Sequence, residues 1–161
     1  MNLKILFAFA IVVLPGIFFC VSGNAFAQKP SEKAINNYIK KEAKAQQADE
    51  YEKARKILFG DLDGDDDRDA VVQYTLEGFQ GGNNWSQFLA VFRNDRGIYK
   101  FAADEVVGGK LSARTFVLQR IINRKILVLT ESCPDLPQGI CENPKKGKAT
   151  FVFRRGKLLE Q

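Results

Sequence analysis

The sequence contains no histidine, and this absence excludes several kinds of chemistry at once. Imidazole is the base of Ser-His-Asp and Cys-His catalysis, a common zinc ligand and the usual pH switch near neutrality. Cysteine is scarce, with three residues, and tryptophan occurs once. The hydrophobic (45%) and charged (27%) fractions are those of an ordinary globular protein, so the chain is expected to fold. The absence of histidine and the scarcity of cysteine leave it few catalytic groups.

Residues 1–27 have the pattern of an export signal. Lys4 provides a positive start, residues 5–21 are almost wholly apolar, and Ala25-Phe26-Ala27 supplies the small residues that a signal peptidase reads. A Pro-Gly pair interrupts the apolar run, which is too short for a stable membrane span. We therefore predict cleavage before Gln28 and a periplasmic or secreted protein without stable membrane insertion. Removing 27 of the 161 residues leaves 134, enough for one domain.

Two cysteines remain after this cleavage, because Cys20 belongs to the signal. Cys133 and Cys141 lie in the segment CPDLPQGIC, which also contains two prolines and a glycine. Their spacing is wider than that of a Cys-x-x-Cys redox site, and two cysteines without histidine do not make a zinc site. In an exported chain this spacing indicates one small structural disulfide loop.

Hydrophobic periodicity divides the mature chain into two parts. Residues 28–56 have apolar residues at helical spacing and predict an N-terminal helical segment, either one bent helix or two shorter ones. Residues 57–161 have the period of strands joined by short turns, which requires mostly antiparallel pairing. The expected fold is α+β and mostly β: a twisted antiparallel sheet of about 6–8 short strands with the N-terminal helix packed against it.

Alternation and turn residues locate individual strands. Residues 70–76 alternate as a half-buried strand does, while residues 88–92 are apolar on both faces, as in a central strand. Hairpin turns are expected at 94–97, at 123–124 between strands 114–122 and 126–130, and at 155–156 between strands 149–153 and 157–159.

Six aspartates occupy nine residues in the segment FGDLDGDDDRDA, residues 59–70. Like charges crowded this closely repel one another unless a cation neutralises them. Carboxylates at positions 1, 3, 5 and 9 of a tight loop can surround a hard cation. Ca²⁺ accepts about six to eight oxygens with flexible geometry, whereas Mg²⁺ needs a strict octahedron. The alternative is an acidic surface turn that holds no ion.

The loop and its flanks resemble the FG-GAP or VCBS-type repeat, in which the pattern DxDGDGxxD lies between two strands. Phe59-Gly60 precedes the loop and Ala70-Val71-Val72 follows it, as in that family. Asp66 stands where the family has its second glycine, a position that tends to require positive φ; Asp tolerates this at a cost of roughly 1 kcal/mol. The resemblance implies Ca²⁺ ligation by the side chains of Asp61, Asp63, Asp65 and Asp69, with the carbonyl of Asp67 as a fifth ligand.

The loop occurs as a solitary copy, whereas FG-GAP repeats in series close into a propeller. The longer segment DAVVQYTLEGFQGGNNWSQFLAVF, followed by VGGK and the late cysteine loop, resembles small exported bacterial proteins with a single VCBS or FG-GAP domain. An EF-hand does not fit, because its twelfth position carries an acidic ligand and here carries Val72.

The connector GFQGGNNW, residues 78–85, offers a second candidate site. Asn83, Asn84 and Trp85 could form a recognition tip for a glycan or a protein, because exposed aromatic residues on loops often bind partners. The alternative is a hairpin turn whose tryptophan folds back onto the sheet. Nucleic acid is not an expected partner, since no nucleic-acid module is recognisable.

Together these features predict an exported Ca²⁺-binding domain, a non-enzymatic binding or structural module of the bacterial envelope or extracellular space. Its partner there is expected to be a protein or a glycan. No catalytic residue is expected, because Asp104 and Glu105 point to opposite faces of a strand and a saturated Ca²⁺ cage leaves no open coordination position. Two alternatives remain open: a protein inhibitor of a secreted hydrolase, and a hydrolase.

Overall fold

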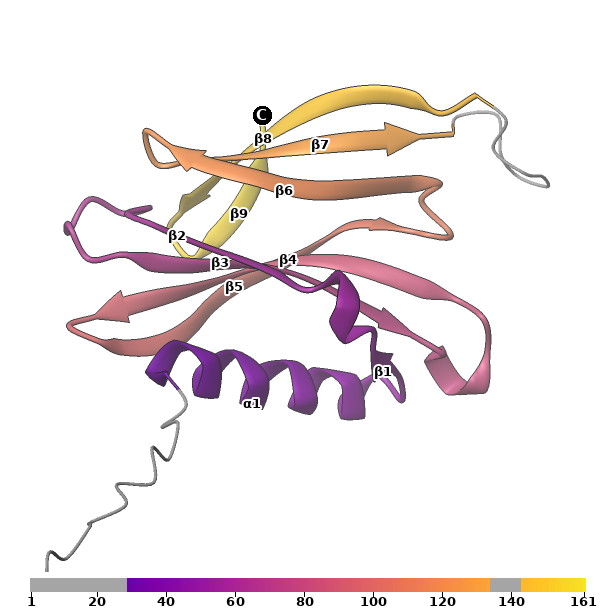
Figure 1. Cartoon of the computed structure of the whole chain (residues 1–161), viewed down its shortest axis with the longest axis horizontal. Coiled ribbons are helices and arrows are strands. Elements are labelled where there is room, and N and C mark those ends of the chain that lie inside the picture. The colour runs from indigo at the N-terminus through magenta and orange to yellow at the C-terminus, as the bar shows by residue number, and fades with distance from the viewer. Residues whose placement is uncertain (1–28, 134–142) are drawn as a thin grey trace, which may run out of the picture.

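The computed structural model describes residues 29–133 and 143–161. These residues form one α-helix, α1 (Pro30–Ala45), two 3₁₀ turns, η1 (Glu52–Ala54) and η2 (Phe79–Gly81), and nine strands in one antiparallel sheet (Figure 1). The predicted fold class is confirmed, with one strand more than the expected range. The strands are β1 (Asp49–Glu50), β2 (Lys56–Gly60), β3 (Asp69–Glu77), β4 (Trp85–Asp95), β5 (Ile98–Gly109), β6 (Arg114–Ile122), β7 (Lys125–Ser132), β8 (Lys145–Arg154) and β9 (Lys157–Glu160).

The helix is shorter than the segment 28–56 that periodicity predicts. Pro30 at its first position and Glu32 in its first turn favour its start. After Ala45 the chain turns through Gln47, whose φ of 52° is left-handed, and β1 pairs with the end of β3. Pairing with the sheet therefore overrides the helical propensity of the residues after 45.

The sheet bends between β5 and β6. Its order is β1-β3-β4-β5-β6-β7-β8-β9, with β2 beside β1 on the same edge of β3. Within the described chain, β5 and β6 pair at the single position Gly109–Arg114. A side chain at Gly109 would lie 2.9 Å from the Trp85 carbonyl oxygen, so glycine permits this close packing at the bend.

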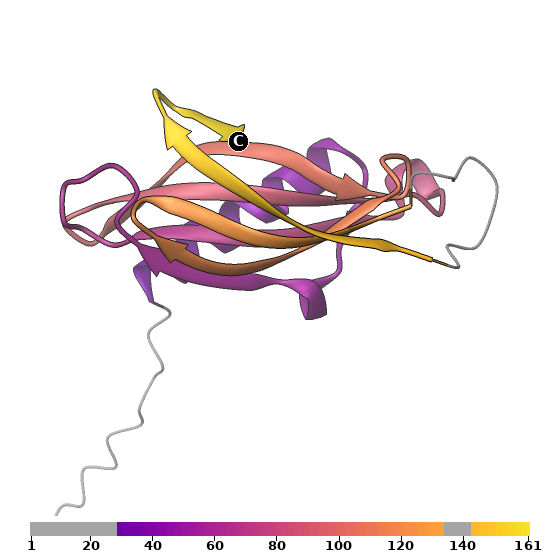
Figure 2. The same cartoon turned by 90° about the horizontal axis from the view of Figure 1, so that it is seen from above.

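The bend creates three layers. In Figure 1, α1 covers one face of the half-sheet β3–β5, and the half-sheet β6–β9 covers the other. In Figure 2, the yellow strand β9 and the end of β8 run at an angle to the pink strands of the first half, as the twist of a sheet dictates. Among the described residues, no helix has the length and apolarity needed to cross a membrane.

Two hydrophobic cores lie between these layers. Ile35 and Ile39 of α1 belong to one core together with Val72, while Val71, its neighbour in β3, belongs to the other core together with Leu118 of the second half-sheet. Residues 70–76 are therefore buried on both faces, and the prediction of a half-buried strand is wrong because the second half-sheet covers the other face. The prediction that residues 88–92 form a central strand is confirmed.

A hydrogen-bonded group fastens α1 to the sheet. The Tyr38 hydroxyl donates to Asp104 Oδ2 over 2.7 Å, and the fully buried Tyr74 hydroxyl donates to the same oxygen over 3.3 Å. The ring of Tyr38 also stacks on Phe101, with centroids 4.1 Å apart. Burial is the main cause that raises the pKa of both tyrosines well above the ordinary value.

Candidate metal centre

Four connections gather at one end of the molecule, on the left in Figure 1. They are the acidic loop, residues 61–68, between β2 and β3, and the three turns of the hairpins β4–β5, β6–β7 and β8–β9. The predicted turns at 94–97, 123–124 and 155–156 are confirmed. Each turn has an arginine in a left-handed conformation, with φ of 52° at Arg96, 59° at Arg124 and 51° at Arg155.

The acidic loop is curled by hydrogen bonds from its own backbone. Asp61 Oδ1 accepts from the N–H groups of Asp63 at 3.1 Å and Gly64 at 2.5 Å, and Asp65 Oδ1 accepts from the N–H of Asp67 at 3.0 Å. Gly64 and Asp66 have φ of 92° and 67°, so the expected positive φ at Asp66 is confirmed. Aspartates suit such a loop because their short side chains bond to nearby backbone N–H groups.

Three of the loop aspartates converge. Asp61, Asp63 and Asp65 each have a carboxylate oxygen, and these oxygens lie within 4.8 Å of one another. This set, the acidic triad, consists of hard oxygen donors with little burial, which are the donors that Ca²⁺ and Mg²⁺ prefer. The residues present therefore fit a divalent hard cation.

Asp69 and Asp67 have other partners. The fully buried carboxylate of Asp69 accepts from the N–H of Leu62 at 3.0 Å and from the N–H of Asn94 at 2.9 Å. Burial raises the pKa of Asp69, and the two amide donors oppose that rise. Asp67 Oδ2 accepts from the N–H of Arg96 at 2.8 Å. These two carboxylates join the loop to the β4–β5 hairpin, and neither belongs to the acidic triad.

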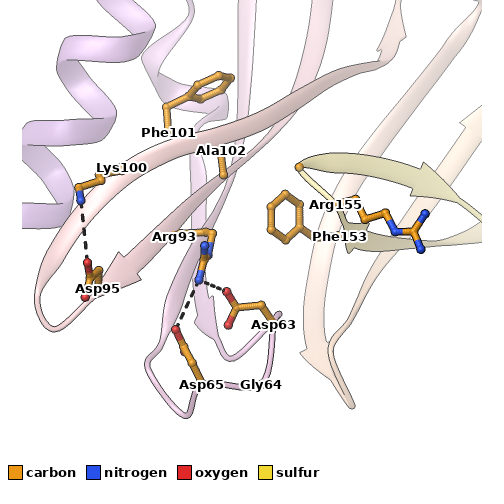
Figure 3. Close-up of a pocket in the computed structure, with 11 residues that line it drawn as sticks. Asp63, Gly64, Asp65, Arg93, Asp95, Lys100, Phe101, Ala102, Phe153 and Arg155 are labelled. Atoms are coloured by element: carbon orange, nitrogen blue, oxygen red, sulfur yellow. Dashed lines mark ion pairs between the residues drawn. The ribbon is translucent and has the colours of Figure 1, made fainter.

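Two arginines from distant parts of the chain partly neutralise the acidic triad. The Arg93 Nη2 atom of β4 lies 2.5 Å from Asp63 Oδ2 and 3.7 Å from Asp65 Oδ2 (Figure 3). Arg124 Nε, from the β6–β7 turn, lies 3.7 Å from Asp61 Oδ2. Neither arginine was predicted from the sequence as part of the site. The only signal was their position near the ends of strands that an antiparallel sheet brings to the same end.

The second candidate site lies at the opposite end of β4. Asn83 and Asn84 are exposed, and Trp85 is half-buried in β4, where it pairs with Glu77. The Lys110 Nζ atom donates to Asn83 Oδ1 over 2.9 Å. The connector is thus a β3–β4 turn region whose tryptophan belongs to the sheet, and its role as a recognition tip stays a prediction.

Two other predictions fall on residues outside the described ranges. The export signal, residues 1–27, is one of them. The Cys133–Cys141 disulfide involves residue 141, which lies in the gap 134–142, so this pairing also stays a prediction. Cys133 itself follows β7, and its N–H donates to the Ala113 carbonyl oxygen over 2.8 Å.

Comparisons with protein-family models, with curated proteins and with solved structures give no match for this chain. The acidic triad by itself does not identify an FG-GAP repeat. The resemblance of the loop to that family therefore stays a prediction.

Proposed function

We propose that this protein is an exported, non-enzymatic Ca²⁺-binding domain that acts as a binding or structural module of the bacterial envelope or extracellular space. The observation that carries the proposal is the convergence of the Asp61, Asp63 and Asp65 carboxylates within 4.8 Å. Carboxylates this close repel one another; Arg93 and Arg124 offset only part of this repulsion, and a divalent cation among the carboxylates would remove the rest. The export pattern of residues 1–27 supports a periplasmic or secreted location.

Calcium is favoured over other cations by the chemistry of the donors. Zinc prefers nitrogen and sulfur ligands, and the acidic triad offers oxygen alone. Magnesium holds its water firmly and needs near-ideal octahedral geometry, whereas Ca²⁺ adapts to a loop of irregular shape. The resemblance of residues 59–72 to the FG-GAP calcium loop supports the same choice.

Isothermal titration of Ca²⁺ into the folded protein tests the proposal. Saturable binding below millimolar concentration is expected. At a Ca²⁺ concentration a hundredfold above Kd, the free energy of unfolding should rise by about 2.7 kcal/mol, and the melting temperature should rise with it. A chelator should reverse the gain. Asp63→Ala and Asp65→Ala should each flatten the response, because each removes a ligand.

Asp95→Asn is the matched control. Asp95 lies at the same end of the molecule, 3.3 Å from Arg96 Nε and 3.9 Å from Lys100 Nζ, and is outside the acidic triad. Its replacement should leave most of the Ca²⁺ response intact. Absence of Ca²⁺ binding up to millimolar concentration in folded wild-type protein would refute the proposed function.

A further inference from the structure

A groove adjoins the acidic triad on the side of the β8–β9 hairpin. It has a volume of about 860 Å³, within the range of small-molecule sites. Asp63 and Asp65 line it, so two residues of the acidic triad belong to the wall of the groove. In Figure 3, the ring of Phe153 points from β8 toward Ala102 and Arg93, across the groove from the loop.

A second cavity, of about 490 Å³, shares Asp63, Phe153 and Arg155 with this groove. Its charged lining is basic apart from Asp63, and consists of Arg124, Lys125, Arg154 and Arg155. The two hollows thus meet at one aromatic ring, and basic side chains surround the second. The first groove is balanced, with Asp63, Asp65 and Asp95 against Arg93, Lys100 and Arg155. A divalent cation bound there would make it positive as well, and an elongated ligand with repeated negative charges would then fit both hollows.

The partners of Asp69 and Asp67 bear on the coordination of a cation. Among the described residues, the carboxylate oxygens that lie within 4.8 Å of one another are those of the acidic triad, whereas the Asp69 and Asp67 carboxylates contact the β4–β5 hairpin. Calcium takes about six to eight oxygens, so a triad leaves coordination positions for other oxygen donors. The fuller ligand set that includes the Asp69 side chain and the Asp67 carbonyl stays a prediction, and these five ligands are still fewer than the roughly six to eight oxygens that Ca²⁺ takes. Because Asp63 and Asp65 belong to the groove wall, an ion held by them would be accessible to a ligand in the groove.

Arg93 supplies the complementary charge. Its guanidinium now pairs with Asp63 and Asp65, the two carboxylates that a cation would take. A divalent cation bound there would compete for these carboxylates and repel the guanidinium, and the Arg93 N–H donors would then be available to an anion. Guanidinium groups bind carboxylates in a bidentate manner, and such charge-assisted hydrogen bonds are strong.

We propose that the groove binds a linear acidic polysaccharide, with a uronic acid carboxylate held between the Ca²⁺ ion and Arg93 and a sugar ring over Phe153. This inference rests on the proposed Ca²⁺ site. A sugar chain is favoured over other polyanions because Phe153 lines both hollows. Its ring is half-buried against the core, and the part that remains exposed can pack against the apolar face of a sugar ring. Asp95 and Lys100, which also line the groove, provide an acceptor and a donor for sugar hydroxyls.

The test is isothermal titration of the full mature protein with trigalacturonate, and with maltotriose as the neutral sugar of equal length. Binding of trigalacturonate is expected in Ca²⁺ and is expected to disappear in a chelator, while maltotriose should bind at least about tenfold more weakly in Ca²⁺. A calcium titration on the same samples is run in parallel, so that failure at the metal and failure at the groove are distinguished.

Two variants examine the groove. Arg93→Gln should weaken trigalacturonate binding about tenfold, because a charged hydrogen-bond donor is lost. Phe153→Leu removes the flat ring while keeping an apolar side chain, and should weaken binding without removing Ca²⁺ binding. Arg96→Gln is the matched control, since Arg96 is at the same end, is largely exposed and lines neither hollow.

Each outcome decides one point. Calcium binding without trigalacturonate binding overturns the groove proposal and leaves the proposed function intact, whereas absence of calcium binding overturns the proposed function itself. Undiminished trigalacturonate binding in chelator overturns the metal bridge. Equal binding of triglutamate or triphosphate overturns the assignment to a sugar. Equal losses of trigalacturonate affinity in Arg93→Gln and Arg96→Gln would show that the overall positive charge at this end, rather than the groove, binds the ligand.

Discussion

The backbone N–H of Leu118 in β6 donates a hydrogen bond to Gln73 Oε1 in β3 over 2.7 Å, although the two residues are 45 positions apart. Gln87 Oε1 accepts from the N–H of Phe116 in the same way, at 2.9 Å. The backbone N–H groups of Phe116 and Leu118 lie beyond the Gly109–Arg114 pair, where β5 and β6 have separated. Side-chain amides therefore replace a neighbouring strand for the β6 backbone, and this allows the sheet to bend without leaving buried donors unsatisfied.

Gln73→Leu should destabilise the fold by about 1–3 kcal/mol, because the buried N–H of Leu118 loses its acceptor. Urea denaturation followed by circular dichroism measures this change. Gln119→Leu is the control: Gln119 lies exposed in β6, and its replacement should change the free energy of unfolding by less than about 0.5 kcal/mol. Equal effects of the two changes would contradict the role given to Gln73.

Tyr38 and Tyr74 should govern the alkaline limit of stability. Their folded-state pKa values are raised above the unfolded value of about 10. Their contribution is therefore fully present below pH ~10 and is lost as pH rises above it, because the unfolded chain ionises first. Phenolate absorbance and circular dichroism should show these two tyrosines ionising together with unfolding.

The variant Tyr38→Phe tests whether Tyr38 is one of the tyrosines that ionise in the alkaline unfolding transition. One tyrosine fewer should ionise in the unfolding step, and the Phe101 contact should largely survive the loss of the hydroxyl. Complete ionisation of the wild-type tyrosines in protein that keeps its native circular dichroism would contradict this prediction.

Arg93→Gln should strengthen Ca²⁺ binding, in contrast to its expected effect on an acidic sugar. The guanidinium competes with the ion for Asp63 and Asp65, and its removal also lowers the local positive charge. A several-fold lower Kd for Ca²⁺ is expected by titration calorimetry. Arg55→Gln serves as the control, because Arg55 pairs with Glu50 away from the loop. A weaker Ca²⁺ affinity in Arg93→Gln would show that the guanidinium supports the site instead.

Export and oxidation can be tested on the protein recovered from its native compartment. Mass spectrometry should find the N-terminus at Gln28 and a peptide pair linked through Cys133 and Cys141. A loop this short should stabilise the fold by about 2–3 kcal/mol, chiefly by restricting the unfolded chain. Retention of residues 1–27, or two free thiols in oxidised material, would contradict the prediction.

Several features of the fold could be predicted from the sequence because local chemistry decides them. Two-residue hairpin turns form where Arg-Gly or Asn-Arg follows an apolar strand, since the turn and the strands on either side lie within a few residues. The start of α1 depends on Pro30 and on apolar residues at helical spacing. The convergence of Asp61, Asp63 and Asp65 follows from alternate spacing within one tight loop. The extent of β5 was not predicted, because register shifts in its pairing with β4 interrupt the alternation of apolar and polar residues along it.

What the tertiary structure alone decided depends on the bend at Gly109 and Arg114. The bend places the second half-sheet over the first, and this buries both faces of β3 and gives Gln73 its partner. It also brings Arg124 and Phe153 to the acidic loop, where they join Arg93. Sequence periodicity reports which face of a strand is apolar but not which distant strand will cover it. The spacing of the aspartates thus determined the candidate metal ligands, while the folding of one half-sheet onto the other determined the arginines and the groove beside them.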